Sequence, residues 1–495
     1  MALAVIVVRL ALVGQHQGLW GVDVGAYLIS AHSYMGIDQS VDFLRPPFAP
    51  GLLLVPFLRL FGDDIGTKLF AVAATVPLSA AWWWLCRHVL TPWQSVYAMV
   101  LLSADWMLAE MFAAGDLPMI GFAALLVAIV ALWRFSERYD WRMGAMFVAS
   151  AAAIPYVNQT SAGIAVLVLP LALVAIGLER RRLTPTIVRI TPWAILAGTL
   201  CLPLVTIYLA VAPGAGILRY PGPLVTTYPW PNIAWVLALA GAAFAGLLLW
   251  RSRGLMRVFG VILLCLAFLV PLFSRDETVL NVFYRARYLE SMLISLAAVW
   301  GVGRLLAMPD GKVAGWLYAG VAAPAFIIIA ATQIQSSIAR DTMITTDTMA
   351  ALEYIAKQPE NGTLIANSYS MALGIAGLTN RTVAWPQAYE PPRAYTEQHA
   401  DVLCILGWDD GCDVDQAVAR RDAAYVIVDT RWPAHSRYSR PSDTNRWDPK
   451  RDFGYIWGMP QVPDPWAVTA NQPWLTPVFE QGSTVVWQIQ MNAEA

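Results

Sequence analysis

Long apolar runs separated by short polar loops dominate the chain up to about residue 335. A run of about 20 apolar residues is long enough to cross a lipid bilayer as a helix. The first run, MALAVIVVRLALVG, is short and contains Arg9. It could be a signal-peptide core, but no small-residue cleavage site follows it, so we interpret it as an uncleaved first helix whose upstream start could be missing or misassigned. Ten further runs bring the prediction to about eleven transmembrane helices: 65–87, 96–113, 117–134, 143–157, 161–178, 190–211, 232–250, 256–273, 288–306 and 313–331.

The apolar stretch from Phe48 to Phe61 differs from these runs because it contains Pro50, Pro56 and Arg59. A proline breaks the hydrogen-bond ladder of a helix, and an arginine prefers the headgroup region to the hydrocarbon. We therefore predict an interfacial or re-entrant helix over this stretch.

The pattern changes from Arg340 onward, where charged residues are spread throughout and apolar residues come in short runs. The pattern predicts helices at 346–358 and 413–421 and strands at 363–369, 423–430 and 483–490. Helices that alternate with strands indicate a small α/β domain. The predicted fold is a polytopic α-helical membrane protein, with a transmembrane domain over 1–335 and an extracytoplasmic α/β domain over 336–495.

A segment rich in proline and tryptophan lies between Thr430 and Trp474. Its aromatic side chains have two alternative roles. They stack on sugar rings, or they pack onto the domain or the membrane interface, and we favour packing.

The composition agrees with a membrane protein, because 58% of the residues are hydrophobic, only 14% are charged, and the mean hydropathy is +0.53. The net charge of −1 excludes simple electrostatic binding to nucleic acid, which requires a basic surplus. The sequence contains no nucleotide-binding motif of the Walker or Rossmann type.

Arginines cluster in alternate short loops, at 134–142, 180–182 and 251–257. The positive-inside rule assigns these loops to the cytoplasm, which places the N-terminus inside. The loop from Trp20 to Pro50 and everything after about residue 332 then lie on the outer, periplasmic or extracellular face.

Cys404 and Cys412 bracket a short loop in the outer domain. Outside the cytoplasm they would form a small disulfide loop, and the alternative is two free thiols. Cys86, Cys201 and Cys265 fall in apolar runs, where a thiol is ordinarily a small apolar core group.

Four polar features lie on the predicted outer face. Asp23 follows the first apolar run and could accept a proton, although a solvated loop acid is the simpler interpretation. Arg45, held by Pro46 and Pro47, could bind a phosphate oxygen or anchor a helix by snorkelling. Asp116 precedes a Leu-Pro pair and would also serve as a helix N-cap.

The fourth feature is the sequence YRARYLES, in which Arg285, Arg287 and Tyr288 open the tenth helix from the outer side. Arginines at a helix N-terminus oppose the helix dipole, so an anionic partner is expected there. Two acids and two arginine sites at one membrane face provide a base for an acceptor and cations for a departing phosphate.

These residues resemble motifs of the GT-C superfamily of polyprenyl-phosphate-sugar-dependent glycosyltransferases, in its protein mannosyltransferase and lipid A aminoarabinose transferase branch. The matching positions are D-x-x-x-Y-x-x-x-A at Asp23, Tyr27 and Ala31, F-x-[KR]-P-P at Phe43 to Pro47, G-D-x-P at Asp116, and R-Y at Arg287 and Tyr288. The family often has two adjacent acids at the first site, whereas Val24 follows Asp23 in this chain.

The resemblance implies roles for these residues. Asp23 looks like the acid that activates the acceptor, and Asp116 like a second acid that supports the acceptor or a metal. Arg45 and Arg287 resemble contacts to the donor phosphate. The remaining expected positions are Arg285 and Tyr288 for the phosphate, and Trp20, Tyr27, His32 and Asp42 for the substrate.

The implied reaction is inverting transfer of a sugar from a polyprenyl-phosphate donor to a hydroxyl of a glycan, lipid or protein acceptor. His16 and His32 could ligate a metal, but a lone loop histidine is usually polar surface. We therefore assign no metal ligand and no cofactor, and keep a divalent metal as the alternative. Two other function classes stay open: a transporter or flippase for a lipid-linked or anionic substrate, and a non-catalytic membrane protein that binds glycans.

Overall fold

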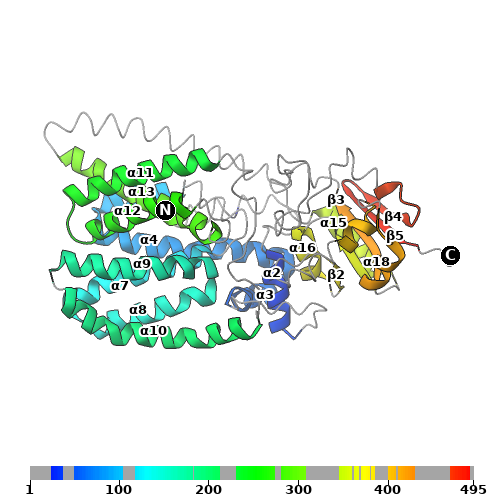
Figure 1. The fold of residues 1–495 in the computed structure, drawn as a ribbon, viewed down its shortest axis with the longest axis horizontal. Helices are drawn as coiled ribbons and strands as arrows, with labels where there is room; N and C mark the ends of the chain where they lie inside the picture. The colour runs from blue at the N-terminus through cyan, green and yellow to red at the C-terminus, as the bar shows by residue number, and fades with distance from the viewer. Residues whose placement is uncertain are drawn as a thin grey trace.

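The computed structural model describes residues 10, 24–36, 49–103, 118–181, 183–211, 230–273, 280–307, 345–358, 362–366, 369–379, 381–384, 400–407, 411–429 and 469–490. The helical part contains α2 (Val24–Tyr34), α3 (Ala49–Ala73), α4 (Thr75–Val89), α5 (Pro92–Ser103), α7 (Pro118–Arg138), α8 (Trp141–Val157), α9 (Gln159–Glu179), α10 (Leu183–Val211), α11 (Trp230–Arg251), α12 (Leu255–Phe273) and α13 (Leu280–Ala307). Figure 1 shows α7, α8, α9 and α10 running along the long axis, with the sheet at one end of the molecule.

Within the described ranges, five segments are long and apolar enough to cross a membrane: Ala49–Val89, Met119–Arg138, Ser161–Glu179, Leu183–Leu204 and Ala286–Ala307. Two shorter apolar helices are Ala238–Arg251 and Leu255–Phe268. The chain is an integral membrane protein, but the predicted count of eleven spans is not confirmed. The predicted last span, 313–331, and the first segment apart from Leu10 lie outside the described residues.

The helix predicted over Phe48 to Phe61 corresponds, from Ala49 on, to the part of α3 that precedes a kink, and its interfacial placement stays a prediction. The backbone leaves helical geometry at Gly62, with φ 74° and ψ 177°, and then continues as helix to Ala73. A positive φ is accessible to glycine at little cost, so the kink forms at this residue and not at Pro56.

The arginine-rich loops meet at the end of the bundle opposite the sheet. Glu137 at the end of α7 binds Arg180 at the end of α9, with an N–O distance of 2.6 Å, and also Arg134 at 3.1 Å. Glu179 accepts a hydrogen bond of 2.7 Å from the backbone N–H of Gly254. These contacts join the three loops that the arginine pattern assigned to one face.

The sheet part contains α15 (Thr346–Ala356), β1 (Thr363–Ala366), α16 (Tyr369–Leu378), β2 (Val383–Ala384), α18 (Val414–Arg421), β3 (Ala423–Asp429), β4 (Leu475–Gln481) and β5 (Thr484–Ile489). The five strands form one mixed sheet in the order β2-β1-β3-β5-β4. β1 is parallel to β2 and β3, whereas β5 is antiparallel to β3 and β4. The predicted α/β character is confirmed.

Side-chain caps explain where the helices of this part begin. The Thr345 hydroxyl accepts from the N–H of Thr348 at 3.2 Å, and Asp413 accepts from Gln416 at 3.0 Å. Each bond satisfies an N–H that has no partner within the first turn of the helix. Asp422 then ends α18 in the left-handed conformation, with φ 49°.

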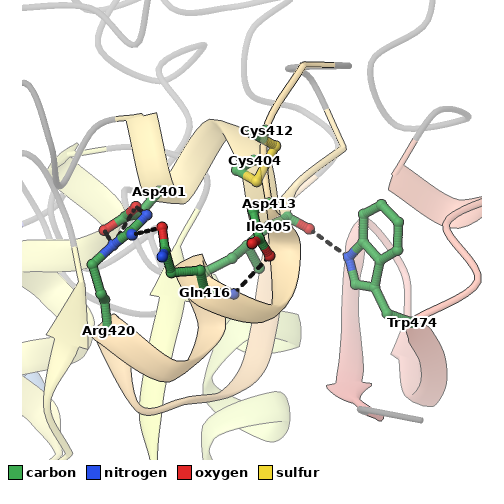
Figure 2. Close-up of a disulfide and its surroundings, with 8 residues drawn as sticks. All are labelled: Asp401, Cys404, Ile405, Cys412, Asp413, Gln416, Arg420 and Trp474. Carbon is green, nitrogen blue, oxygen red and sulfur yellow. Dashed lines mark hydrogen bonds and ion pairs between the residues drawn. A yellow bond between two sulfur atoms is a disulfide. The ribbon is translucent and has the colours of Figure 1, made fainter. Parts of the chain in front are cut away.

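Cys404 and Cys412 form a disulfide, which decides between the two alternatives left open by the sequence. Figure 2 shows the polar contacts around it. The Trp474 indole N–H donates to the carbonyl of Ile405 at 3.0 Å. The buried carboxylate of Asp401 accepts from Arg420 at 3.1 Å. The disulfide thus joins the segment that carries Asp401 to the start of α18.

Replacing Cys404 and Cys412 together by alanine is expected to destabilise the sheet part by about 2 to 3 kcal/mol. The disulfide closes a short loop and so lowers the conformational entropy of the unfolded chain, which is regained when the bond is removed. The measurement is thermal unfolding of the purified protein with and without a thiol reductant. Reductant should lower the midpoint for the wild type and leave the double variant unchanged. Cys265→Ala, at a free cysteine, is the control that should keep the sensitivity to reductant.

Candidate active site

The structure describes four of the predicted site residues: Tyr27, His32, Arg287 and Tyr288. Arg285 lies within α13, but its side chain is not described. The remaining predicted positions, Trp20, Asp23, Asp42, Arg45 and Asp116, lie outside the described residues. The site is therefore built from the helices that begin directly after Asp23 and Asp116 and from the turn of α13 that carries Arg287.

Arg287 and Tyr288 are buried in the bundle near the beginning of α13, with exposed fractions of 4% and 6%. The Tyr288 ring packs edge-on against Phe122 of α7, with ring centroids 6.4 Å apart. α7 begins at Pro118, two residues after Asp116 in the chain. The Tyr288–Phe122 contact therefore joins the R-Y pair to the helix that follows the G-D-x-P turn.

The first turn of α7 also reaches a second hydrophobic core. Ile120 packs against a cluster that contains Leu28 of α2, Leu54 of α3 and Leu364 of β1. Ile120 and Phe122 are two residues apart, so one short stretch of α7 contacts both the α2 cluster and the R-Y pair. In the sequence, Phe122 and Tyr288 are 166 residues apart (288 − 122), and Leu28 and Ile120 are 92 apart (120 − 28).

α2 lies between α3 and α16, as Figure 1 shows. Leu28 and Ile29 of α2 are almost completely buried in the shared core. The helices approach closely at glycines. A Cβ at Gly51 of α3 would lie 2.6 Å from the Ser30 Cβ, and a Cβ at Gly377 of α16 would lie 2.9 Å from the Gly25 carbonyl oxygen. The helix that follows Asp23 is thus held on one side by the sheet part and on the other by α3.

Gly377→Val is expected to separate α16 from α2 and to destabilise the protein by about 1 to 3 kcal/mol, because the atom it would meet is backbone and cannot turn aside. The matched control is Gly198→Val in α10, where a Cβ would meet nothing within 4 Å. Thermal unfolding of both variants in detergent checks this prediction. Equal midpoints for the two variants would contradict the proposed role of the close approach.

His32 is buried at the end of α2, and its Nε2 lies 3.0 Å from Oδ1 of Asp63 in α3. Asp63 follows Gly62 directly, so the kink in α3 places this carboxylate beside His32. The sequence analysis did not identify Asp63, because nothing local indicates that this position of the next helix will face His32. In the described part of the chain, no group of three or more acidic, histidine or cysteine side chains is arranged to hold a metal.

Glu290 is a further functional candidate that the sequence analysis did not single out. It lies in YRARYLES, three residues after Arg287, and its exposed fraction is 0%. The available signal was a carboxylate inside an otherwise apolar run, which is costly in a membrane and commonly functional.

The arrangement of α2, α7 and the Arg287–Tyr288 pair suits a reaction in which a group is transferred and an anion departs. α2 begins directly after Asp23, and α7 begins two residues after Asp116 and packs through Ile120 against the core that contains α2. Tyr288, which contacts Phe122 of α7, is directly preceded in α13 by the buried Arg287. Negative charge grows on a phosphate as it departs. A fixed arginine stabilises that charge, and the stabilisation is stronger inside a protein than in water.

No protein-family model matches the sequence. No curated protein matches it either. Solved structures do match in fold. The arabinofuranosyltransferase AftD from Mycobacteria has a TM-score of 0.57 and 14% identity, covering 100% of this chain. The chain spans only 42% of the length of AftD.

Two further structures match at similar levels. ArnT from Cupriavidus metallidurans bound to undecaprenyl phosphate has a TM-score of 0.57 and 14% identity, covering 98% of this chain and 96% of ArnT. The oligosaccharyltransferase of Archaeoglobus fulgidus has a TM-score of 0.54 and 12% identity, covering 87% of this chain and 70% of that protein. The chain therefore has the fold of the GT-C glycosyltransferases, as the resemblance of its motifs to that superfamily predicted.

Proposed function

We propose that this protein is an inverting glycosyltransferase that moves a sugar from a polyprenyl-phosphate donor to an acceptor hydroxyl at the outer face of the membrane. The observation that carries the proposal is a pair of contacts near the beginning of α7. Ile120 packs against the core that contains α2, and Phe122 packs against Tyr288 of α13. The helix that follows Asp116 thereby contacts both the core around the helix that follows Asp23 and the residue next to the candidate phosphate-binding arginine.

In the proposed reaction, Asp23 accepts the proton of the acceptor hydroxyl while that oxygen attacks the anomeric carbon of the sugar. The bond between the anomeric carbon and the phosphate oxygen breaks, and the electron pair leaves with the phosphate. Arg287 and Arg45 stabilise the added negative charge, with Arg285 and Tyr288 as further contacts. Attack on the face opposite the leaving phosphate inverts the anomeric configuration.

Asp116 supports the acceptor in this scheme, and Trp20, Tyr27, His32 and Asp42 line the substrate side. Of these, Tyr27 and His32 lie on α2, which packs against α16 of the sheet part. This packing favours a model in which residues 1–335 catalyse the transfer and residues 336–495 help to bind the acceptor.

A lipid-linked donor is favoured by two of the fold relatives. ArnT from Cupriavidus metallidurans was solved with undecaprenyl phosphate, and AglB from Archaeoglobus fulgidus with dolichol-phosphate and an inhibitory peptide. A buried arginine close to the outer end of a membrane bundle suits such a phosphate, whose isoprenoid chain stays in the lipid.

The outer location of the sheet part has two supports. Disulfides such as Cys404–Cys412 persist in oxidising compartments outside the cytoplasm. The arginine-rich loops joined by Glu137 and Glu179 lie at the end of the bundle opposite the sheet, which is the end that the positive-inside rule assigns to the cytoplasm.

The test is transfer of radiolabelled sugar by the full chain, purified and reconstituted in lipid, from a panel of hexosyl and pentosyl polyprenyl phosphates. Label in an acceptor, with inverted anomeric configuration by NMR, is the expected result. Movement of intact donor across vesicles without transfer would favour a flippase. Glycan binding with neither transfer nor donor movement would favour a non-catalytic binding protein.

A further inference from the structure

The turn between α7 and α8 and the loop between α9 and α10 form a basic surface at the end of the bundle opposite the sheet. The acids of this surface are already engaged. Glu137 binds Arg180 at 2.6 Å, and Glu179 binds Arg257 of α12 at 3.3 Å. Asp140 caps α8 by accepting a hydrogen bond of 3.0 Å from a backbone N–H of its first turn. Four further arginines are exposed and form no ion pair with an acid among the described residues: Arg138, Arg142, Arg181 and Arg189.

Arg189 of α10 is held in place by aromatic rings. Its guanidinium carbon Cζ lies 3.8 Å from the centre of the Tyr139 ring. That ring packs edge-on against Phe135, with centroids 5.7 Å apart, and Phe135 also packs against Trp193, one turn after Arg189, at 6.1 Å. A guanidinium that stacks through its face keeps the N–H donors along its edge available. Arg189 is therefore positioned to bind an anion through two donors at once.

Tyr139 adopts a backbone conformation that is unusual for a bulky residue. Its φ is 53°, in the left-handed region where glycine is favoured, and Arg181 in the facing loop has a φ of 51°. Such conformations persist only where the surrounding structure holds them, and they are concentrated at functional sites. Glycine would fit at position 139 at less cost. The feature that the tyrosine adds is the ring that supports Arg189.

The surface of α10 beside Arg189 is apolar. α10 has the smallest buried share of the five described segments that could cross a membrane. Its exposed apolar side chains on either side of Arg189 include Val188 and Ile195. Trp141, beside Arg142 in the chain, is 66% exposed, and an exposed tryptophan is typical of the headgroup region of a membrane. Basic side chains thus meet an apolar helix surface at the depth of lipid headgroups.

We propose that this surface binds an anionic phospholipid, whose headgroup contacts Arg138, Arg142, Arg181 and Arg189 and whose acyl chains lie along α10. The site is at the end of the bundle opposite Arg287, so it goes beyond the proposed function. Arg189 binds the phosphodiester, and the other arginines attract the net negative charge of the headgroup. A zwitterionic lipid has the same phosphate but also carries a cation, which these arginines repel. The positive-inside rule assigns this end of the bundle to the cytoplasmic leaflet.

The test is native mass spectrometry of the purified full chain in detergent, titrated with phosphatidylglycerol or with phosphatidylcholine of the same acyl chains. We expect the wild type to bind phosphatidylglycerol at least about tenfold more tightly than phosphatidylcholine, because each arginine near an anionic lipid contributes about a fivefold gain in affinity. Arg189→Gln should weaken phosphatidylglycerol binding about fivefold, and Arg138→Gln combined with Arg189→Gln about 25-fold. The affinity for phosphatidylcholine should not change in either variant.

Arg251→Gln is the matched control. Arg251 lies at the end of α11, in the same basic region of the bundle, and also stacks on an exposed ring, with its Cζ 3.9 Å from the centre of the Trp250 ring. It lies outside the proposed site, so this variant should bind phosphatidylglycerol like the wild type. A second variant, Tyr139→Gly, relieves the backbone strain and removes the support of Arg189. It should fold, as checked by thermal unfolding, and still bind phosphatidylglycerol more weakly.

Three results would overturn the proposal. Equal affinities of the wild type for the two lipids would exclude recognition of the anionic headgroup. Equal losses in Arg189→Gln and Arg251→Gln would indicate a general attraction between charges and no defined site. Displacement of phosphatidylglycerol by inorganic phosphate would indicate an anion site that does not require a lipid. Lipid binding is measured without sugar transfer, so none of these results depends on the proposed function.

Discussion

Asp23→Asn is expected to lower the rate of sugar transfer about 100–10,000-fold, which is the range for loss of a general base. Asparagine has nearly the size of aspartate but cannot accept the proton of the acceptor hydroxyl. Asp23 directly precedes α2 in the chain, and α2 begins at Val24 and packs between α3 and α16. Initial rates with saturating donor and acceptor measure the effect on the chemical step.

The matched control for this prediction is Asp64→Asn in α3. Asp64 is exposed at the surface and forms an ion pair with the half-buried Lys68, with an N–O distance of 2.7 Å, one helical turn away. Such a surface pair contributes about 0.3–0.5 kcal/mol, so the control should fold and transfer sugar like the wild type. Equal rates for Asp23→Asn and Asp64→Asn would exclude Asp23 as the base.

Arg287→Gln is expected to lower kcat about 100–1,000-fold, the usual cost of removing one donor that stabilises a developing negative charge. Arg287→Lys should give an intermediate rate, because lysine retains the charge but lacks the planar fork that binds two phosphate oxygens together. The measurement is kcat and donor KM with the same labelled donor, together with thermal unfolding to confirm that each variant is folded.

Arg304→Gln provides the control on the same helix. Arg304 lies in the last turn of α13, where its guanidinium sits 5.2 Å from the centre of the Trp300 ring, at the end of the helix opposite Arg287. Both substitutions remove one charge from α13. Loss of transfer in both variants would indicate a general requirement for charge in this helix and would contradict a specific phosphate contact at Arg287.

Local patterns predicted most of the helices and strands. The predicted helices over 346–358 and 413–421 and the apolar runs at 423–430 and 483–490 correspond to α15, α18, β3 and β5. Caps, run lengths and alternation depend on neighbours within a few residues, so they can be interpreted from the chain alone. The predicted end of the helix at Phe61 agrees with the kink of α3 at Gly62, whereas Pro56 is accommodated within the helix.

The contacts between distant segments could not be predicted in the same way. No local signal pairs His32 with Asp63, sets Glu290 against Gly241, or brings Gly377 within reach of the Gly25 carbonyl. Each contact depends on which helix faces are adjacent after packing. A glycine at a close helix contact cannot be recognised from the sequence, because glycine also occurs where no neighbouring atom is close. At Gly198, for example, an added Cβ would meet nothing within 4 Å.

The sequence by itself determined that this is a membrane protein with an α/β part near its end, and its motifs indicated the superfamily whose fold it has. Apolar length, charge distribution and short motifs carry that information residue by residue. Only the tertiary structure decided that Cys404 and Cys412 pair, that α2 packs against the sheet part, and that α7 contacts both the core around α2 and Tyr288. These outcomes depend on side chains that are far apart in the chain and meet only when the helices pack.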